Sequence, residues 1–387
     1  MSHSVKLEYL KSIHERYHKS NKLKKTLILN EFCIVCGITR KHAIRLLKHG
    51  LYLRIKRSGP KNKYPPELLL RPLQLVWRAM GEVSAKKLKA GMQEWLLDFN
   101  QSDEPEIYTV EVQNLLRQMS AASMERMMKR SRIKLKGLCS TKPNMRFYNR
   151  IPIQAKDWNV VKPGYVQSDT VAHCGNSLLG SFAFSLTVTD IYSGWTENRG
   201  IWTKGTDGVV QQMRSIEAGL PFKIETFKSD SGTEFMSFRL QRYLQEREQP
   251  IKMVRSRPYK KDDNCYVEQK NFTHVREIFG YERITSRELT DMMNDIYQNY
   301  WNPLQNYFIP STKLLRKTRI GARIKKEFEP HKTPFQRLIE SKDLTMEQKD
   351  ELTARKARLS PFVLRKVLDQ KLREFYELLR RSSIRAA

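Results

Sequence analysis

The chain has 387 residues, with 71 Lys and Arg against 41 Asp and Glu, so its formal net charge is +30. This excess favours a polyanionic partner, because binding phosphates releases their condensed counterions. A mean hydropathy of −0.61 and the lack of an apolar run near eighteen residues exclude a membrane-spanning helix, while the length suggests two to four domains.

Charge by itself also fits a ribosomal-type protein or one that binds a membrane surface. The first residues, MSHSVKLEYLKS, lack the apolar stretch of a secretion signal. The five cysteines are an odd number, which indicates no disulfide framework and suits a reducing compartment. We therefore expect a cytoplasmic protein.

Residues 1–62 are strongly basic and contain a candidate helix-turn-helix in 27–50. Gly37 suits the turn, and Thr39 suits the N-cap of the second helix. That helix would present Arg40, Lys41 and Arg45 to DNA. The alternative is an ordinary helical hairpin with a solvated basic face, but the net charge favours DNA binding. The expected apolar contacts are Phe32, Cys36, Ile38, Ala43 and Leu46.

Residues 63–140 have helical periodicity and contain a weaker helix-turn-helix candidate in 112–134. Ser120 would cap its second helix, and the residues facing DNA would be Arg126, Lys129 and Arg130. Because the turn lacks glycine, a plain structural helix pair is an equal alternative. Residues 141–160 contain Pro, Asn and scattered charge, and we expect a linker there.

Residues 161–310 alternate between strand-like and helix-like segments, which indicates a mixed sheet with helices. Short connections join the first three strands, as in a meander, and the last two alternate with helices. The predicted strands are 164–170, 182–190, 195–202, 224–229 and 251–254, and the predicted helices are 207–218, 234–246, 264–279 and 286–301.

Residues 311–387 are basic, and we predict that they form helices. Thr333–Pro334 and Ser360–Pro361 each have the pattern of an N-cap followed by Pro at the first helical position. TMEQ at 345–348 is a capping-box pattern. Such a region could contact DNA or a second protomer.

Three acidic residues stand where catalytic carboxylates are expected. Asp169 in GYVQSDTV and Asp230 in FKSDSGTEF each follow a short apolar run, as where a strand meets its loop. Glu268 in DDNCYVEQKN opens a helical stretch. Carboxylates from two strands and a helix can converge and hold Mg²⁺, which prefers oxygen ligands. Two such ions form a clamp for displacement at phosphorus.

Glu268 has two acidic competitors, Asp262 and Asp263. We prefer Glu268 because it shares a helix face with Asn271 and Val275, at spacings of three and four. The nearby cations would hold DNA phosphates, although solvated surface charge is the alternative. These cations are Lys260, Lys261 and Lys270.

Four motifs in this order resemble those of the DDE transposase and integrase superfamily, especially bacterial insertion-sequence transposases with a retroviral-type integrase catalytic core. They are SDT (168–170), TDIYSGWTE (189–197), KSDSGTEF (228–235) and YVEQKN (266–271). The resemblance covers over a third of the chain. It implies an α/β fold: a ribonuclease H-like core, with all-α helix-turn-helix domains before it and a helical region after it.

The resemblance also implies an activity. The enzyme would bind the terminal inverted repeats of an element in double-stranded DNA, cleave there, and join 3′-hydroxyl ends to target DNA. Asp169, Asp230 and Glu268 would hold two Mg²⁺ or Mn²⁺ ions per active site. A homo-oligomeric synaptic complex at the bacterial nucleoid is implied. The alternatives are a metal-dependent nuclease of the same fold without strand transfer, and a non-catalytic DNA-binding regulator.

Three further polar residues lie close to these motifs. Asp190 belongs to a strand that is structural in the superfamily, so we leave it outside the catalytic set. His173 and Cys174 follow Asp169 closely and could act as acid–base groups. Such a pair is more often packed and hydrogen-bonded, which is the interpretation we prefer.

Four residues near the N-terminus resemble the zinc-binding set of viral integrases: His14, His18, Cys33 and Cys36. Zinc takes four N or S ligands, and these are the right types. However, both cysteines also fall on the apolar face of the first helix of the predicted helix-turn-helix. We therefore expect the cysteines to pack inside the helix pair, without zinc.

Overall fold

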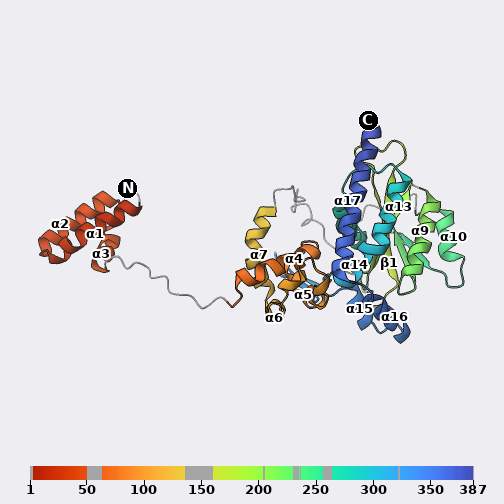
Figure 1. The fold of residues 1–387 in the computed structure, drawn as a ribbon, viewed down its shortest axis with the longest axis horizontal. Coiled ribbons are helices and arrows are strands. Elements are labelled where there is room, and N and C mark those ends of the chain that lie inside the picture. The colour runs from red at the N-terminus through yellow and green to blue at the C-terminus, as the bar shows by residue number, and fades with distance from the viewer. Residues whose placement is uncertain are drawn as a thin grey trace. The chain divides into compact units, whose positions relative to one another are not determined.

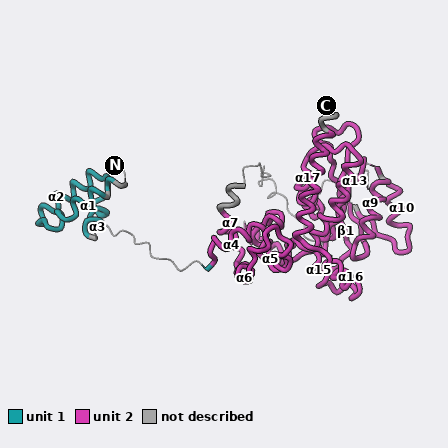
Figure 2. The backbone as a smooth tube through the Cα atoms, in the orientation of Figure 1, with its two compact units in different colours: residues 1–63 teal, residues 64–387 magenta. Residues whose placement is uncertain are grey.

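The computed structural model describes residues 3–49, 63–135, 160–203, 205–229, 235, 237–255, 264–320 and 323–386. The chain divides into two compact units, residues 1–63 and 64–387, which Figure 2 colours separately. Among the helices in these ranges, none combines the length and the apolarity needed to cross a membrane.

The first unit contains α1 (His3–Lys19), α2 (Lys22–Cys36) and α3 (Arg40–His49). Gly37 ends α2 with φ of 62°, a left-handed conformation that glycine adopts without a Cβ clash. The predicted helix pair and its turn are therefore present. The unit has its own apolar core, made by Leu10, Ile13, Ile28, Leu29, Phe32, Cys36, Ala43 and Leu47. Of the expected contacts, Ile38 and Leu46 are only partly buried.

The second unit begins with α4 (Pro66–Ala79), α5 (Ala85–Leu97), α6 (Val110–Gln118) and α7 (Ala121–Leu135), with 3₁₀ turns at Phe99–Gln101 and Pro105–Ile107. Trp95 joins α5 to later parts of the chain. Its Nε1 donates a 3.3 Å hydrogen bond to the carbonyl of Phe308, and its ring lies 4.9 Å from the ring of Phe362. The helices before residue 135 thus share one core with the sheet and the C-terminal helices.

A five-stranded mixed sheet forms the centre of the second unit (Figure 1). Its strands are β1 (Tyr165–Ala172), β2 (Ala183–Asp190), β3 (Thr196–Trp202), β4 (Thr226–Ser229) and β5 (Lys252–Arg255). Their order is β3-β2-β1-β4-β5. β1, β2 and β3 are antiparallel neighbours, whereas β4 runs parallel to both β1 and β5. The predicted meander and all five predicted strands are confirmed.

Helices α9 (Thr206–Gly219), α10 (Phe238–Gln245) and α13 (Arg287–Ile296) alternate with and follow the strands. Both α9 and α13 pack against β3. α13 continues through a π-helical turn (Tyr297–Trp301) into α14 (Asn302–Phe308). A mixed five-stranded sheet of this order, with its helices, fits a ribonuclease H-like core.

The region after residue 310 is only partly helical. α15 (Pro334–Glu340), α16 (Met346–Ala357) and α17 (Pro361–Ala386) confirm the prediction there, and α17 runs beside α13 and α14 (Figure 1). The prediction is wrong for residues 314–328, where β6 (Leu314–Ile320) and β7 (Arg323–Phe328) form an antiparallel hairpin. The β-branched residues Thr318, Ile320 and Ile324 favour a strand, but the many cations between them made this pattern hard to recognise in the sequence.

Candidate active site

Asp169 lies on β1, the central strand, in a half-buried position. Its Oδ2 accepts a 2.7 Å hydrogen bond from Nδ2 of Asn271, and its Oδ1 accepts a 2.8 Å bond from the backbone N–H of Thr170. We expected Asp169 at the end of a strand, but β1 continues to Ala172 because it stays paired with β2. The carboxylate is held between strand and helix.

The neighbouring strand β4 ends beside this position. Its last residue, Ser229, pairs with Ser168, the residue directly before Asp169. Ser229 also directly precedes Asp230 in the sequence. Asp230 itself lies outside the described residues. The paired residues before the two aspartates therefore come from adjacent parallel strands.

Glu268 lies on α11 (Cys265–Lys270), which packs against β1 and β2. The fully buried Val267 fixes this helix, since its backbone N–H donates to Oε1 of Gln167 at 3.3 Å. α11 continues as a π-helix (Asn271–Arg276) and then as α12 (Glu277–Phe279). Glu268 is exposed and lies one turn before Asn271, the residue that contacts Asp169. The competitors Asp262 and Asp263 lie outside the described residues.

The atoms around Asp169 suit a hard divalent cation. The atoms that could bind such a cation are oxygens. Among them, Oδ1 of Asn271 is buried and accepts no hydrogen bond from the described residues. Mg²⁺ and Mn²⁺ prefer such carboxylate and amide oxygens. No three His, Cys, Asp or Glu side chains gather as a metal-binding group within the described ranges. Those ranges include Asp169 and Glu268 but not Asp230.

Lys270 is half-buried, and its Nζ lies 3.5 Å from Nε2 of His274. Burial, together with the smaller effects of the nearby Lys87 and Arg337, lowers the pKa of Lys270 to about 7. The pKa of the buried His274 falls well below its usual value for the same reasons, with burial first and Lys270 next. The Nζ of Lys270 therefore lies against a neutral His274 ring. The other two predicted cations, Lys260 and Lys261, lie outside the described residues.

Asp190 is the buried last residue of β2, next to the turn that leads to β3. Its Oδ1 accepts the Gly164 N–H at 3.0 Å, and its Oδ2 accepts the Ser193 N–H at 2.7 Å and the Ser193 hydroxyl at 2.6 Å. Burial raises the pKa of Asp190 to about 6, although these bonds oppose the shift. Asp190 therefore caps a turn.

His173 and Cys174 lie in different environments. His173 is fully buried, with Nε2 2.8 Å from the Ser185 hydroxyl, and burial lowers its pKa to about 3. Ser185 in turn lies 2.9 Å from the Tyr297 hydroxyl. Cys174 is half-buried. The contacts of His173 are those of a packed, hydrogen-bonded core residue.

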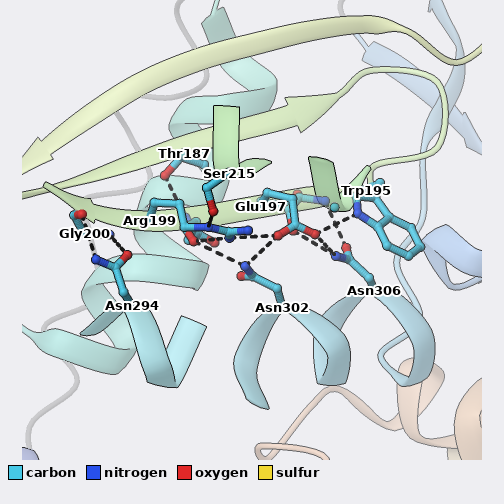
Figure 3. Close-up of polar contacts among 12 residues, drawn as sticks. Thr187, Trp195, Glu197, Arg199, Gly200, Ser215, Asn294, Asn302 and Asn306 are labelled. Atoms are coloured by element: carbon cyan, nitrogen blue, oxygen red, sulfur yellow. Dashed lines mark hydrogen bonds and ion pairs between the residues drawn. The ribbon is translucent and has the colours of Figure 1, made fainter. Parts of the chain in front are cut away.

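The sequence reasoning missed a buried polar network between β3 and the helices after it (Figure 3). Glu197 is at its centre and accepts bonds from Trp195 at 3.0 Å, Arg199 at 3.0 Å and Asn302 at 2.9 Å. Asn306 donates at 2.9 Å to the carbonyl of Thr196 on the same strand. The Arg199 and Glu197 side chains are only 5% and 10% exposed. The signal in the sequence was Asn302 and Asn306, four apart on one helix.

The predicted DNA-facing residues of the first unit are on the surface. Arg40, Lys41 and Arg45 are all exposed on α3, and Arg40 also donates to the side chain of Asn30 on α2. Such an arrangement leaves their positive charge available to a partner. Their contact with DNA stays a prediction.

The weaker helix pair is also present, as α6 and α7. Oγ of Ser120 accepts the backbone N–H of Ser123 at 3.1 Å, so the predicted cap is confirmed. Arg126 and Lys129 are exposed on α7. The side chain of Arg130 lies outside the described residues. DNA binding by this pair stays a prediction.

The four candidate zinc ligands lie in the first unit. The rings of His14 and His18 are 4.5 Å apart, and Nε2 of His18 lies 2.8 Å from the carbonyl of Leu47. Cys36 is buried and Cys33 is half-buried against the same core. Cys36 therefore packs inside the helical unit, as expected, whereas Cys33 packs against its core while partly exposed.

Comparison with known proteins finds a clear relative. The chain is 34% identical over 340 residues to the "Uncharacterized protein y4rM" of Sinorhizobium fredii, which covers 87% of this chain and 96% of the relative. No family model matches the chain.

Two of the solved structures that match this chain illustrate the similarity. The catalytic core domain of BIV integrase is 17% identical, with a TM-score of 0.22 over 27% of this chain and 62% of that chain. A chain of the simian T-cell lymphotropic virus intasome in complex with PP2A regulatory subunit B56 gamma is 14% identical, with a TM-score of 0.26 over 43% of this chain and 55% of that chain. The chain thus spans less than two thirds of either, and the fold assignment rests on strand order and direction.

Proposed function

We propose a function for the family to which this chain and y4rM of Sinorhizobium fredii belong: DNA transposition by phosphoryl transfer. The observation that carries this proposal is the 2.7 Å hydrogen bond from Asn271 to Asp169. It joins the helix that carries Glu268 to the central strand that carries Asp169. Asp230 directly follows the neighbouring parallel strand in the sequence, so the end of that strand would supply the third carboxylate.

Asp169, Asp230 and Glu268 would hold Mg²⁺ or Mn²⁺, two ions per site. Oδ1 of Asn271, which accepts no hydrogen bond from the described residues, fits the same role. Bound there, the ions would activate the attacking oxygen and stabilise the leaving oxygen. The chain's own part is to fix the carboxylates, which it does by anchoring α11 on β1 through Val267 and Gln167.

The two reactions would use different nucleophiles at the same site. Water attacks phosphorus during cleavage, and the freed 3′-hydroxyl attacks during joining. In each step one P–O bond forms as another breaks, so no covalent enzyme intermediate is needed. Because two element ends must be held together, we propose that the enzyme works as a homo-oligomer in a synaptic complex.

The three carboxylates are tested by amide substitution, which removes charge and nearly keeps shape. Asp169→Asn, Asp230→Asn and Glu268→Gln should each abolish both cleavage and joining of element-end DNA while leaving DNA binding intact. Matched controls are Asp291→Asn and Glu288→Gln, which change exposed carboxylates on α13. Both controls should keep full activity with Mg²⁺.

The assay separates the proposal from its alternatives. Cleavage without joining by the unmodified protein would make it a nuclease. Binding without metal-dependent nicking would make it a regulator. Near-normal joining by Glu268→Gln would remove that residue from the site and point to Asp262 or Asp263.

We further propose that the first unit recognises element ends. It has its own core, and Arg40, Lys41 and Arg45 are exposed on one helix. Arg45→Ala should weaken binding to element ends by ~1–3 kcal/mol relative to random DNA if it contacts bases. An equal loss on both DNAs would instead identify a phosphate contact. Exposed Lys48→Ala serves as the control on the same helix.

A further inference from the structure

The hairpin β6–β7 stands out because it has no buried face. Every residue of β7 is exposed, and no residue of β6 is fully buried. A two-stranded hairpin without a packed face is marginal in water. Something other than a core must therefore account for an ordered ribbon at this place.

The root of the hairpin is fastened to the sheet. The Thr312 hydroxyl donates a 2.8 Å bond to the carbonyl of Glu329, which ties the two strands together at their base. The buried Arg337 donates to the Glu329 carboxylate at 2.7 Å and to the carbonyl of Ser311 at 2.8 Å. It also donates to the carbonyl of Ser193, in the turn between β2 and β3, at 3.1 Å. The exposed ribbon thus projects from a fixed base.

The ribbon is strongly basic. Residues 314–328 contain one acid, Glu327, which lies 3.3 Å from Lys325. Lys317 and Lys326 face each other directly across the ladder. Like charges directly opposite each other destabilise a sheet. A bound polyanion would offset this repulsion and so stabilise the hairpin. The six cations are Arg316, Lys317, Arg319, Arg323, Lys325 and Lys326.

We propose that β6–β7 is a DNA-binding arm that docks its cations on the phosphates of a duplex. A two-stranded ribbon has the width of the DNA major groove, and the net positive charge of this ribbon suits the phosphates that line the groove. A second copy of this chain is a poor occupant, because it also carries a net charge of +30. The choice of DNA as the partner rests on the function proposed above. The arm itself contains none of the three carboxylates.

Exposed apolar side chains on the same ribbon support a groove contact. Leu315, Ile320 and Ile324 are 67%, 63% and 51% exposed. Apolar contacts of this kind are made with thymine methyl groups in the major groove. Binding would remove these side chains from water.

The arm is tested in the full-length protein with Lys317→Glu. This change places opposite charges across the ladder from Lys326, so the hairpin is held at least as well as before. The same change lowers the charge of the arm. The matched control is Lys342→Glu, which makes the same charge change at an exposed position between α15 and α16.

Binding to a short duplex of random sequence is measured against salt concentration, with EDTA present to prevent cleavage. Each lost phosphate contact should reduce the slope of log K against log salt by about 0.9, so we expect a decrease of about 1–2 for Lys317→Glu and an affinity loss of about 10-fold at low salt. Lys342→Glu should keep the slope of the unmodified protein.

Several results would contradict the proposal that the arm binds DNA. Equal slopes for the two variants would show that the ribbon touches no phosphate. Unchanged DNA binding with a shift towards monomer in sedimentation would assign it to contacts between copies. If the unmodified protein binds duplex DNA but neither cleaves nor joins it, the enzymatic proposal fails while the slopes still decide the arm. If it binds no duplex, both fail.

Discussion

Nδ2 of Asn271 donates a 2.7 Å hydrogen bond to Oδ2 of Asp169, across 102 positions of the chain. The other amide atom, Oδ1, is buried and accepts no bond from the described residues. One side chain thus fixes the orientation of the central carboxylate and presents an oxygen beside it. Asn271 therefore links the helix to the central strand, and in the proposed function it would position Asp169.

Asn271→Ala should lower strand cleavage by about 10–100-fold, the usual effect of losing a partner that orients a metal ligand. Because the lost group orients Asp169, raising the Mg²⁺ concentration should recover part of the activity. The measurement is the Mg²⁺ concentration at half-maximal activity, which should rise.

A matched control exists on the surface. Asn299 donates a 2.8 Å bond to Asp295, the same amide–carboxylate pair in an exposed place. Asn299→Ala should leave the Mg²⁺ dependence unchanged. If Asn271→Ala also left it unchanged, Asn271 would have only a structural role.

Asp190 gives the protein a pH dependence of stability. Burial raises its pKa from the ordinary 3.8 to about 6 in the folded state. The folded state therefore holds this proton more tightly than the unfolded chain, so its stabilising contribution is present at low pH and is lost as pH rises through about 6. By linkage the loss amounts to up to ~3 kcal/mol between about pH 4 and pH 7.

Asp190→Asn removes the titrating group, and the fall in unfolding free energy with rising pH should become shallower by that amount. Denaturant unfolding at several pH values measures the slope, which is independent of the bonds that the amide loses to Ser193. The exposed Asp291→Asn is the control and should keep the original slope. An unchanged slope in Asp190→Asn would show that Asp190 titrates normally.

Local chemistry explains what the sequence could predict. The predicted N-cap at Thr333 and the predicted capping box of Thr345 with Gln348 are both present, because each cap bonds to the residue three positions later on the same helix. The five strands follow apolar runs between turn residues, and these signals are also local. The spacing predicts Glu268, Asn271 and Val275 on one helix face; Asn271 and the buried Val275 do face inward, whereas Glu268 is exposed.

Long-range partners could not be predicted in this way. The contact between Asn271 and Asp169 depends on how a helix packs against a strand, which no spacing within either motif reveals. The hairpin β6–β7 was missed because its charge suggested a solvated helix. Arg199 was missed because its partner Glu197 and the donor Asn302 meet only when the chain folds.

The network of Figure 3 predicts a large cost for Glu197→Gln. Arg199 would keep its buried positive charge and lose the carboxylate 3.0 Å away. Leaving a buried charge without its partner costs ~3–5 kcal/mol, measured as a lower denaturant midpoint. Adding Arg199→Met should recover part of this loss. Glu246→Gln, which breaks an exposed pair with Arg242, is the control and should change the midpoint far less.

The first unit supplies the last prediction, which concerns zinc. Burial raises the pKa of the Cys36 thiol, whereas a zinc ligand must be a thiolate. His18 is already engaged through Nε2 with the carbonyl of Leu47 at 2.8 Å. We therefore expect purified protein to contain no zinc by elemental analysis. Cys36→Ser should destabilise the unit by ~1–3 kcal/mol, since a buried hydroxyl replaces the thiol, and Cys33→Ser should do so less. About one zinc per chain, lost in the double Ser variant, would contradict the packing interpretation and make the metal part of the fold.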